Sequence, residues 1–166
     1  MTFKEGFLAL ERRLTGVAML GAGVMLVLAA SLGLFQILTR FVFEQPAEWS
    51  EVLIRFALIW MVFLGIPEAF RMGSMVSIDL FHRLAPRAVR RWLEALIALV
   101  TLSLLAVYVW YGWDYAQRGS VQSMAGLESI SMFWAYIAIP IGSLFAAFGV
   151  IGNFLEPRHS ELDTAQ

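Results

Sequence analysis

The feature that most limits how this chain can fold is a set of uncharged apolar stretches of membrane-crossing length. Asp, Glu, Lys and Arg are all absent from four stretches, Leu14–Thr39, Phe56–Pro67, Ala95–Trp113 and Ser129–Leu155. A helix needs roughly 18 or more such residues to cross about 30 Å of hydrocarbon, and all but the second stretch are long enough. The sequence therefore predicts an all-α integral membrane protein with four transmembrane helices and short interfacial amphipathic segments.

Composition supports a single membrane domain over residues 1–166. The predicted spans are about 14–39, 50–70, 90–114 and 129–155, with an interfacial loop at 71–89 and a polar tail at 156–166. Charged residues make up 15% of the chain, against about 25% in soluble domains, so no soluble domain of ordinary size fits. The absence of cysteine excludes disulfides, thiolate metal sites and cysteine nucleophiles. A net charge of −1 gives no reason to expect a nucleic-acid partner.

The first apolar stretch is longer than the roughly 7–15 residues of a signal-peptide core, so we expect an uncleaved anchor. Before and into it, apolar residues recur at helical spacing beside charged ones, at Phe3, Phe7, Leu10 and Leu14. This pattern fits either a short amphipathic lead-in at the membrane surface or an early start of the first transmembrane helix.

The second stretch is too short to cross a bilayer alone, because its residues extend only about 18 Å at a rise of roughly 1.5 Å per residue. To span, this helix must include Arg55 and Glu68 at its ends and reach back toward Glu51. These ionisable groups are therefore expected near the headgroup boundary.

Prolines mark the last two helices. Pro86 suits the first turn of a helix, and the third helix is expected to run from there to about Arg118. Pro140 lies inside the fourth stretch and is expected to free a backbone carbonyl and kink that helix.

The distribution of positive charge predicts the orientation of the chain in the membrane. Nine of the twelve Lys and Arg residues would lie on one side, namely Lys4, Arg12, Arg13, Arg71, Arg83, Arg87, Arg90, Arg91 and Arg158. The other side would hold Arg40, Arg55 and Arg118. Because Lys and Arg concentrate in cytoplasmic loops, both termini and the central loop are expected in the cytoplasm.

Residues that could carry chemistry inside the membrane are scarce. The only histidines, His82 and His159, lie outside the spans, and no glycine-rich phosphate-binding pattern is present. Deep in the spans, the polar residues are hydroxyls without a charged neighbour, Ser31, Thr101, Ser103 and Ser143. We therefore predict no catalytic residue, no cofactor-binding residue and no metal ligand, and the chain is not expected to be an enzyme.

The strongest local signal lies at the start of the second span, where Glu48, Glu51 and Arg55 fall on one face of a helix. Glu51 precedes Arg55 by four residues, which is the favourable order for a helical ion pair. Charges partly inside a membrane need mutual pairing or a partner chain, so this set indicates a structural ion pair or a subunit interface. The alternative is an Arg55 that snorkels toward the headgroups beside an incidental neighbour. Glu68 and Arg71 form a similar candidate pair at the other end.

Other residues suggest packing and lipid contacts. Packing anchors are expected at Trp49, Trp60, Gly65 and Gly142. Small residues that let helices pack closely share one face of the first span, at Ala18, Ala22, Ala29 and Gly33, and one face of the fourth, at Ala138, Gly142, Ala146 and Gly149. Anionic lipid headgroups are expected to contact the arginines Arg83, Arg87, Arg90 and Arg91. The alternative is that these arginines only reflect the general cytoplasmic bias of positive charge.

A longer motif surrounds the second span. It reads Glu48-Trp49-x-Glu51-x-x-x-Arg55, then Trp60, Phe63-Leu64-Gly65, Ala69-x-Arg71 and Val76-x-Ile78-Asp79. In this order and spacing, and in its four spans, the chain resembles the small membrane subunit of tripartite ATP-independent periplasmic (TRAP) transporters. The detailed match covers about Glu48 to Leu84. Members of that family often carry a histidine where this chain has Gly73-Ser74-Met75, so no role of that histidine carries over.

The resemblance implies a function that composition alone does not show. A large membrane subunit of elevator type would move the substrate, and a periplasmic binding protein would deliver an organic acid such as a C4-dicarboxylate, a sialic acid or a keto acid. Sodium coupling is expected in the large subunit, with no cofactor in this chain. The small subunit would be a scaffold in the bacterial inner membrane, with those two proteins and membrane lipids as partners. The alternatives are a small autonomous homodimeric transporter and, less favoured, a small membrane enzyme.

Overall fold

Long helices make up most of the computed structural model, which describes residues 3–45, 47–72, 87–124 and 127–156. The long helices are α1 (Phe3–Phe41), α2 (Glu48–Met72), α4 (Arg87–Gly119) and α6 (Ala138–Leu155). A short helix α5 (Phe133–Tyr136) precedes α6, and the strands β1 (Ser123–Met124) and β2 (Leu127–Ser131) form an antiparallel hairpin. Four helical segments are long and apolar enough to cross a membrane, which confirms the predicted all-α membrane class.

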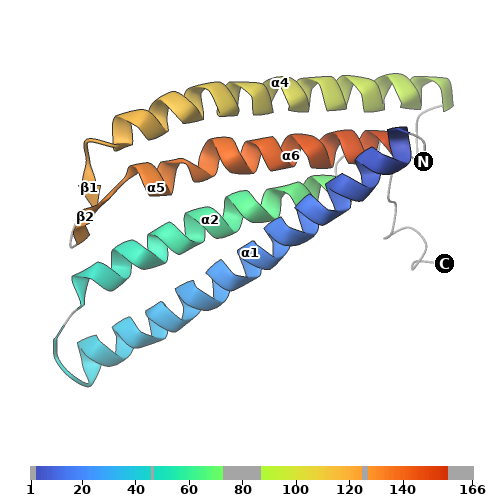
Figure 1. Cartoon of the computed structure of the whole chain (residues 1–166). Coiled ribbons are helices and arrows are strands. Elements are labelled where there is room, and N and C mark those ends of the chain that lie inside the picture. Colours follow the sequence, from blue (N-terminus) through green and yellow to red (C-terminus); the bar gives the residue numbers. More distant parts are fainter. Residues whose placement is uncertain (1–2, 46, 73–86, 125–126, 157–166) are drawn as a thin grey trace, which may run out of the picture.

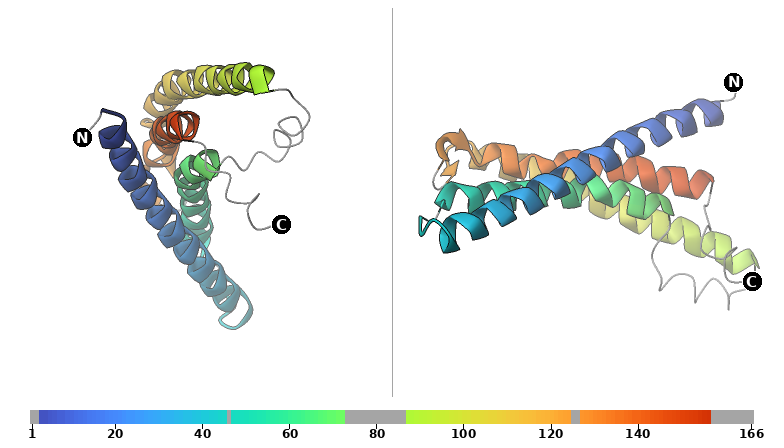
Figure 2. Two further views of the ribbon diagram at one scale, coloured as in Figure 1. Left: turned by 90° about the vertical axis from the view of Figure 1, so that its right-hand side faces the viewer. Right: turned by 90° about the horizontal axis from the view of Figure 1, so that it is seen from below.

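The helices lie side by side in the order α4, α6, α2, α1 (Figure 1). α1 packs along α2 and runs obliquely across it, so that the N-terminal part of α1 reaches α6 (Figure 2). The start of α1, the ends of α2 and α6 and the start of α4 lie at one end of the molecule. The α1–α2 connection and the hairpin lie at the other end. We call these the terminal end and the hairpin end.

The small residues predicted on one face of the fourth span make α6 the central helix. Ala138, Gly142, Ala146 and Gly149 are all buried. A Cβ on Gly142 would lie 2.6 Å from the carbonyl oxygen of Phe63, and one on Gly149 would lie 2.5 Å from that of Pro67. Glycine is therefore required at both positions, because α2 and α6 touch backbone to backbone there.

Pro67 explains why α6 approaches α2 at this point. A proline has no N–H, so the Phe63 carbonyl four residues earlier receives no helical hydrogen bond from it. Gly142 covers that carbonyl with its bare Cα. Burial against a glycine backbone shields the freed oxygen from lipid, where a polar group without a partner is costly.

On α1, the predicted small-residue face is only partly used. Ala18, Ala22 and Ala29 are buried. At Gly33, by contrast, an added Cβ would meet nothing within 4 Å. Gly33 is therefore not a site of close helix packing within this chain, whereas a Cβ on Gly21 would lie 3.1 Å from Leu64 of α2.

The structure of α1 decides between a separate amphipathic lead-in and an early start of the first transmembrane helix. α1 is continuous from Phe3, so the residues before Leu14 belong to the same helix as the first span. A separate surface lead-in is not formed. Much of the predicted interfacial loop, 73–86, and the polar tail from residue 157 lie outside the described residues.

The fourth helical segment begins later than predicted. Residues 129–131 belong to strand β2, and the helix starts at Phe133. Hydrogen bonds to the end of α4 favour this local structure, since the Ser131 hydroxyl donates to the Gly119 carbonyl at 2.9 Å and accepts the N–H of Phe133. Pro140 does not kink the middle of a helix. It lies in the first turn of α6, where its missing N–H breaks no helical bond.

Candidate functional site

The predicted pair at the start of α2 is formed. The Arg55 guanidinium donates to the Glu51 carboxylate one helical turn away. Both side chains are largely exposed, Arg55 by 73% and Glu51 by 54%. α4 carries a similar exposed pair at the same end, Asp114 with Arg118 at 2.5 Å. The side chain of Glu48 is outside those that the structure describes.

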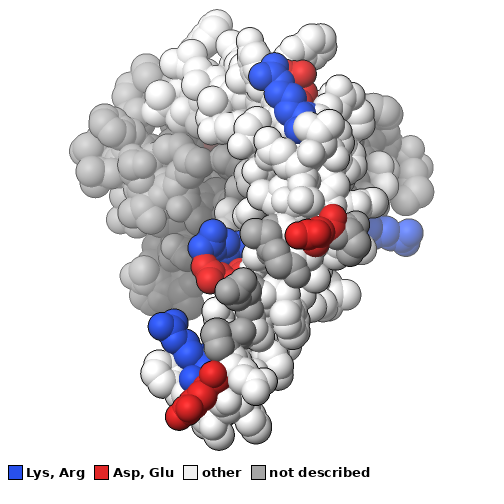
Figure 3. Space-filling view, turned by 90° about the vertical axis from the view of Figure 1, so that its left-hand side faces the viewer, with Lys and Arg blue, Asp and Glu red and all other residues white. Residues whose placement is uncertain are grey.

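Viewed from the hairpin end, the surface is mostly uncharged, and opposite charges lie beside one another at separate places on it (Figure 3). An exposed pair of this kind contributes little to the stability of a chain, typically about 0.2–1 kcal/mol. The chain's own fold therefore gives little reason for the Glu51–Arg55 pair.

The pair belongs to a longer exposed face of α2. The face follows alternating steps of four and three residues, and its members, all exposed except the half-buried Gly65, are Glu51, Arg55, Leu58, Val62, Gly65, Ala69 and Met72. We call it the outer face of α2. Steps of four and three residues give a straight seam against a neighbouring helix that crosses at about 20°. Gly65 and Ala69 add a small-residue pair at a spacing of four.

The predicted packing anchors divide into two groups. Trp60 donates from Nε1 to the Trp134 carbonyl at 2.9 Å and so ties α2 to α5. Trp49 packs against Phe35 with the rings tilted by 42° and their centroids 5.7 Å apart, and so ties α2 to α1. Gly142 is the tight contact described above.

Gly65 behaves differently from these three anchors. Nothing lies within 4 Å of a Cβ added to it, so within this chain the position has room for a side chain. The prediction of Gly65 as an anchor is therefore wrong for the chain's own packing. Gly65 lies on the outer face of α2.

The pair predicted between Glu68 and Arg71 is not formed. Arg71 bonds instead to Glu11 of α1, with Nε 3.1 Å from Oε2. Both side chains are buried, Arg71 at 1% exposure and Glu11 at 0%. Residues 67 and 71 share the face of α2 that packs on α1 and α6, so Arg71 turns inward while Glu68 lies on a neighbouring face.

Two further groups complete this buried cluster. The Thr15 hydroxyl donates to Oε1 of Glu11 at 3.1 Å, and Arg71 Nη1 donates to the carbonyl oxygen of Glu156 at 2.7 Å. Gly152 leaves room for the carboxylate, because a Cβ there would lie 3.0 Å from Cδ of Glu11. We call Glu11, Thr15, Arg71 and the Glu156 carbonyl the clasp. It joins α1, α2 and the end of α6 at the terminal end.

Sequence reasoning missed the clasp because its partners are far apart along the chain. The spacing of Glu11 and Thr15 by four residues was the available signal, but Arg71 lies 60 residues from Glu11. One nitrogen of the cluster, Nη2 of Arg71, is buried without a hydrogen-bond partner.

The predicted headgroup contacts are only partly placed. Arg83 lies outside the described residues, and Arg87, Arg90 and Arg91 lie in the first turns of α4 with side chains that are not described. Their contact with lipid stays a prediction. Within the described ranges, no three histidine or acidic side chains gather as a metal site requires. Both histidines fall outside those ranges.

Comparison with known proteins assigns a family. Residues 29–159 match the family described as tripartite ATP-independent periplasmic transporters, DctQ component. The sialic acid TRAP transporter small permease protein SiaQ of Vibrio cholerae is 29% identical over 114 residues, which cover 69% of this chain and 65% of SiaQ. The sialic acid TRAP transporter permease protein SiaT of Haemophilus influenzae is 29% identical over 116 residues, 70% of this chain but only 19% of SiaT.

A third relative is the C4-dicarboxylate TRAP transporter small permease protein DctQ of Pseudomonas aeruginosa, 25% identical over 103 residues, which cover 59% of this chain and 49% of that protein. The chain thus spans just under two thirds of SiaQ and about half of this DctQ. It belongs to the DctQ component family of TRAP transporters, as the resemblance indicated. This is a family of transporter components and not of enzymes. With its four candidate spans, the chain is a multi-pass protein of the bacterial inner membrane.

Proposed function

We propose that this chain is the static small subunit of a sodium-driven, binding-protein-dependent importer of organic acids. In this role it braces a much larger membrane subunit, which carries the substrate and the sodium ions. The names of the relatives support an organic-acid substrate, since they are transporters for sialic acid and for C4-dicarboxylates. The substrate class of this chain is proposed as C4-dicarboxylate, sialic acid or keto acid.

The observation that carries the proposal is the outer face of α2. It runs the length of a membrane span, begins with an exposed ion pair and includes a glycine that the chain's own packing does not need. A large subunit that packs on this face would cover the Glu51–Arg55 pair at the membrane boundary and use Gly65 for close approach. Without such a partner, Glu51, Arg55 and Gly65 would face lipid or solvent and would contribute little to the chain's own fold.

The internal structure of the chain supports a static role. α6 contacts α2 backbone to backbone at two glycines, and the clasp joins α1, α2 and α6 through buried hydrogen bonds. Transport sites in membranes usually need broken helices with polar groups that converge near the midplane. The break between α5 and α6 lies near the hairpin end instead, and aromatic and aliphatic residues surround it.

The orientation is part of the proposal. The terminal end carries most of the positive charge, so we place it in the cytoplasm and the hairpin end in the periplasm. The Glu51–Arg55 and Asp114–Arg118 pairs then face the periplasm, close to where a binding protein would dock on the large subunit.

Purification of the tagged chain from its native membrane tests the proposal. We expect a TRAP large permease subunit to co-purify, and Arg55→Ala and Gly65→Leu each to reduce its yield. Arg118→Ala removes an equally exposed pair from α4 and serves as the matched control, with unchanged yield. The isolated chain in liposomes should show no sodium-driven uptake. Uptake by the chain alone, or full yield from both α2 variants, would refute the proposed role.

A further inference from the structure

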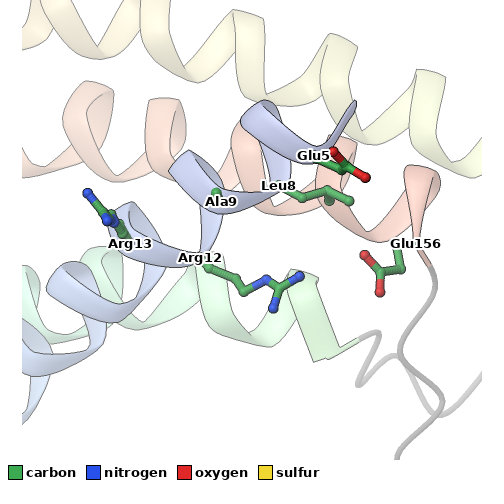
Figure 4. A pocket seen from close by; sticks show the side chains of 6 residues that line it. All are labelled: Glu5, Leu8, Ala9, Arg12, Arg13 and Glu156. Atoms are coloured by element: carbon green, nitrogen blue, oxygen red, sulfur yellow. The ribbon is translucent and has the colours of Figure 1, made fainter. Parts of the chain in front are cut away.

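A pocket opens at the terminal end, outside the face assigned to the large subunit. It has a volume of about 470 Å³ and is lined by Glu5, Leu8, Ala9, Arg12, Arg13 and Glu156 (Figure 4). A water molecule occupies about 30 Å³ in the liquid, so this space suits a polar organic group rather than a single ion.

The pocket lies at the depth where hydrocarbon gives way to lipid headgroups. Arg12 and Arg13 immediately precede the first uncharged stretch, and Glu156 immediately follows the last one. Both stretches are membrane spans, so the first charges beyond them mark the boundary. The pocket therefore lies within reach of lipid headgroups.

The pocket is lined by charged groups of both signs. Arg12 reaches from α1 toward the side of the pocket on which Glu156 lies, while Arg13 points the other way (Figure 4). Among the ion pairs between described residues, none joins Arg12 to Glu156. The lining holds two arginines and two glutamates; Glu5, Arg12 and Arg13 come from α1, and Glu156 lies at the C-terminal end of α6.

The clasp holds the acidic side of the pocket in place. The Glu156 carbonyl accepts from buried Arg71 Nη1 at 2.7 Å, and the Glu156 N–H donates to the Gly152 carbonyl at 3.0 Å. These bonds fix the backbone from which the Glu156 carboxylate projects. The backbone is therefore already ordered where a ligand would meet this side chain, which removes part of the entropy cost of binding.

We propose that this pocket binds the zwitterionic headgroup of an ethanolamine phospholipid. The phosphate pairs with the guanidinium of Arg12, the primary ammonium donates to the carboxylate of Glu156, and the lipid's apolar parts pack on Leu8 and Ala9. A primary ammonium has three N–H donors, and a choline headgroup has none. An anionic headgroup would pair with Arg12 but bring a like charge toward Glu156.

Native mass spectrometry of the purified full-length chain tests this assignment. The protein is placed in nanodiscs with equal amounts of phosphatidylethanolamine, phosphatidylcholine and phosphatidylglycerol, then extracted under mild conditions. We expect phosphatidylethanolamine to be retained in preference to the other two. Arg12→Gln and Glu156→Gln should each lower its occupancy by about two- to fivefold, as expected for an ion pair near the surface.

Two further variants make the result specific. Ala9→Leu fills the floor of the pocket without a change of charge and should also displace the lipid. Arg118→Gln removes an exposed arginine at the hairpin end and should leave occupancy unchanged. Preference for phosphatidylglycerol, equal retention of phosphatidylcholine, or wild-type occupancy in the Arg12 and Glu156 variants would overturn the assignment. Displacement of the lipid by soluble O-phosphoethanolamine at equal concentration would assign the pocket to a soluble ligand and would also overturn it.

Discussion

Removal of one partner of the clasp should be among the most destabilising single changes in this chain. In Glu11→Met the side chain keeps its length but loses its charge, and Arg71 remains buried at 1% exposure with the Glu156 carbonyl as its one acceptor among the described residues. Nη2 of Arg71 has no partner even in the native chain, so the remaining hydrogen bonding is poor. Breaking a buried pair in this way typically costs about 3–5 kcal/mol.

The double variant Glu11→Met/Arg71→Met separates the pair from the packing around it. Replacing both members of a buried ion pair by apolar groups of similar volume is often close to neutral. We therefore expect the double variant to be more stable than either single variant. The exposed Glu51–Arg55 pair is the matched control, and its loss should cost at most about 1 kcal/mol.

Equilibrium unfolding in detergent micelles, followed by tryptophan fluorescence, measures these differences, since the chain has six tryptophans. A loss of about 3–5 kcal/mol corresponds to a fall in Tm of about 6–20 °C for a chain of this size. A loss below about 1 kcal/mol in Glu11→Met, or a double variant as unstable as the sum of the single variants, would refute the reasoning. Either result would mean that Arg71 is hydrated and does not depend on Glu11.

Three other predictions concern packing and orientation. Gly142→Ala should cost about 1–3 kcal/mol in the isolated chain because its Cβ would lie 2.6 Å from a backbone oxygen, whereas Gly65→Ala should leave unfolding unchanged. Trp60→Phe removes the hydrogen bond from α2 to the Trp134 carbonyl of α5 and should cost about 1 kcal/mol, measured by the same unfolding assay. Because the chain has no cysteine, a single Lys4→Cys variant should react with a membrane-impermeant maleimide only after cells are opened, and Ser120→Cys should react in intact spheroplasts. The reverse labelling pattern would refute the proposed orientation.

The spans were predictable from the sequence because each depends on local composition. The length of an uncharged stretch and the charges at its two ends are properties of one helix. The uncharged stretch in α2 is too short to span alone, and α2 does extend to include Glu51, Arg55 and Glu68. The pair of Glu51 and Arg55 was predictable for the same reason, since the spacing of four residues within one helix brings the groups together.

The clasp was not predictable because it depends on how helices cross. Arg71 lies one turn from Glu68, yet the oblique packing of α1 on α2 places Glu11 nearer. The small face of the fourth span showed that α6 would be buried, but not that it would pack over a carbonyl freed by Pro67. The start of that helix at Phe133 also depends on a tertiary contact, the bond from Ser131 to the end of α4.

The two ends of the molecule use charge in different ways, and this difference bears on the proposed role. At the terminal end, Glu11 and Arg71 are paired inside the chain, so any rotation of α1 relative to α2 would separate two buried charges. At the hairpin end, Glu51 and Arg55 are exposed and contribute little to the fold. A moving element would need its buried pairs to exchange partners during transport. A brace needs the opposite arrangement, in which buried charges keep their partners inside the chain and other charges lie on the outer surface. The buried Glu11–Arg71 pair and the exposed Glu51–Arg55 pair have this arrangement.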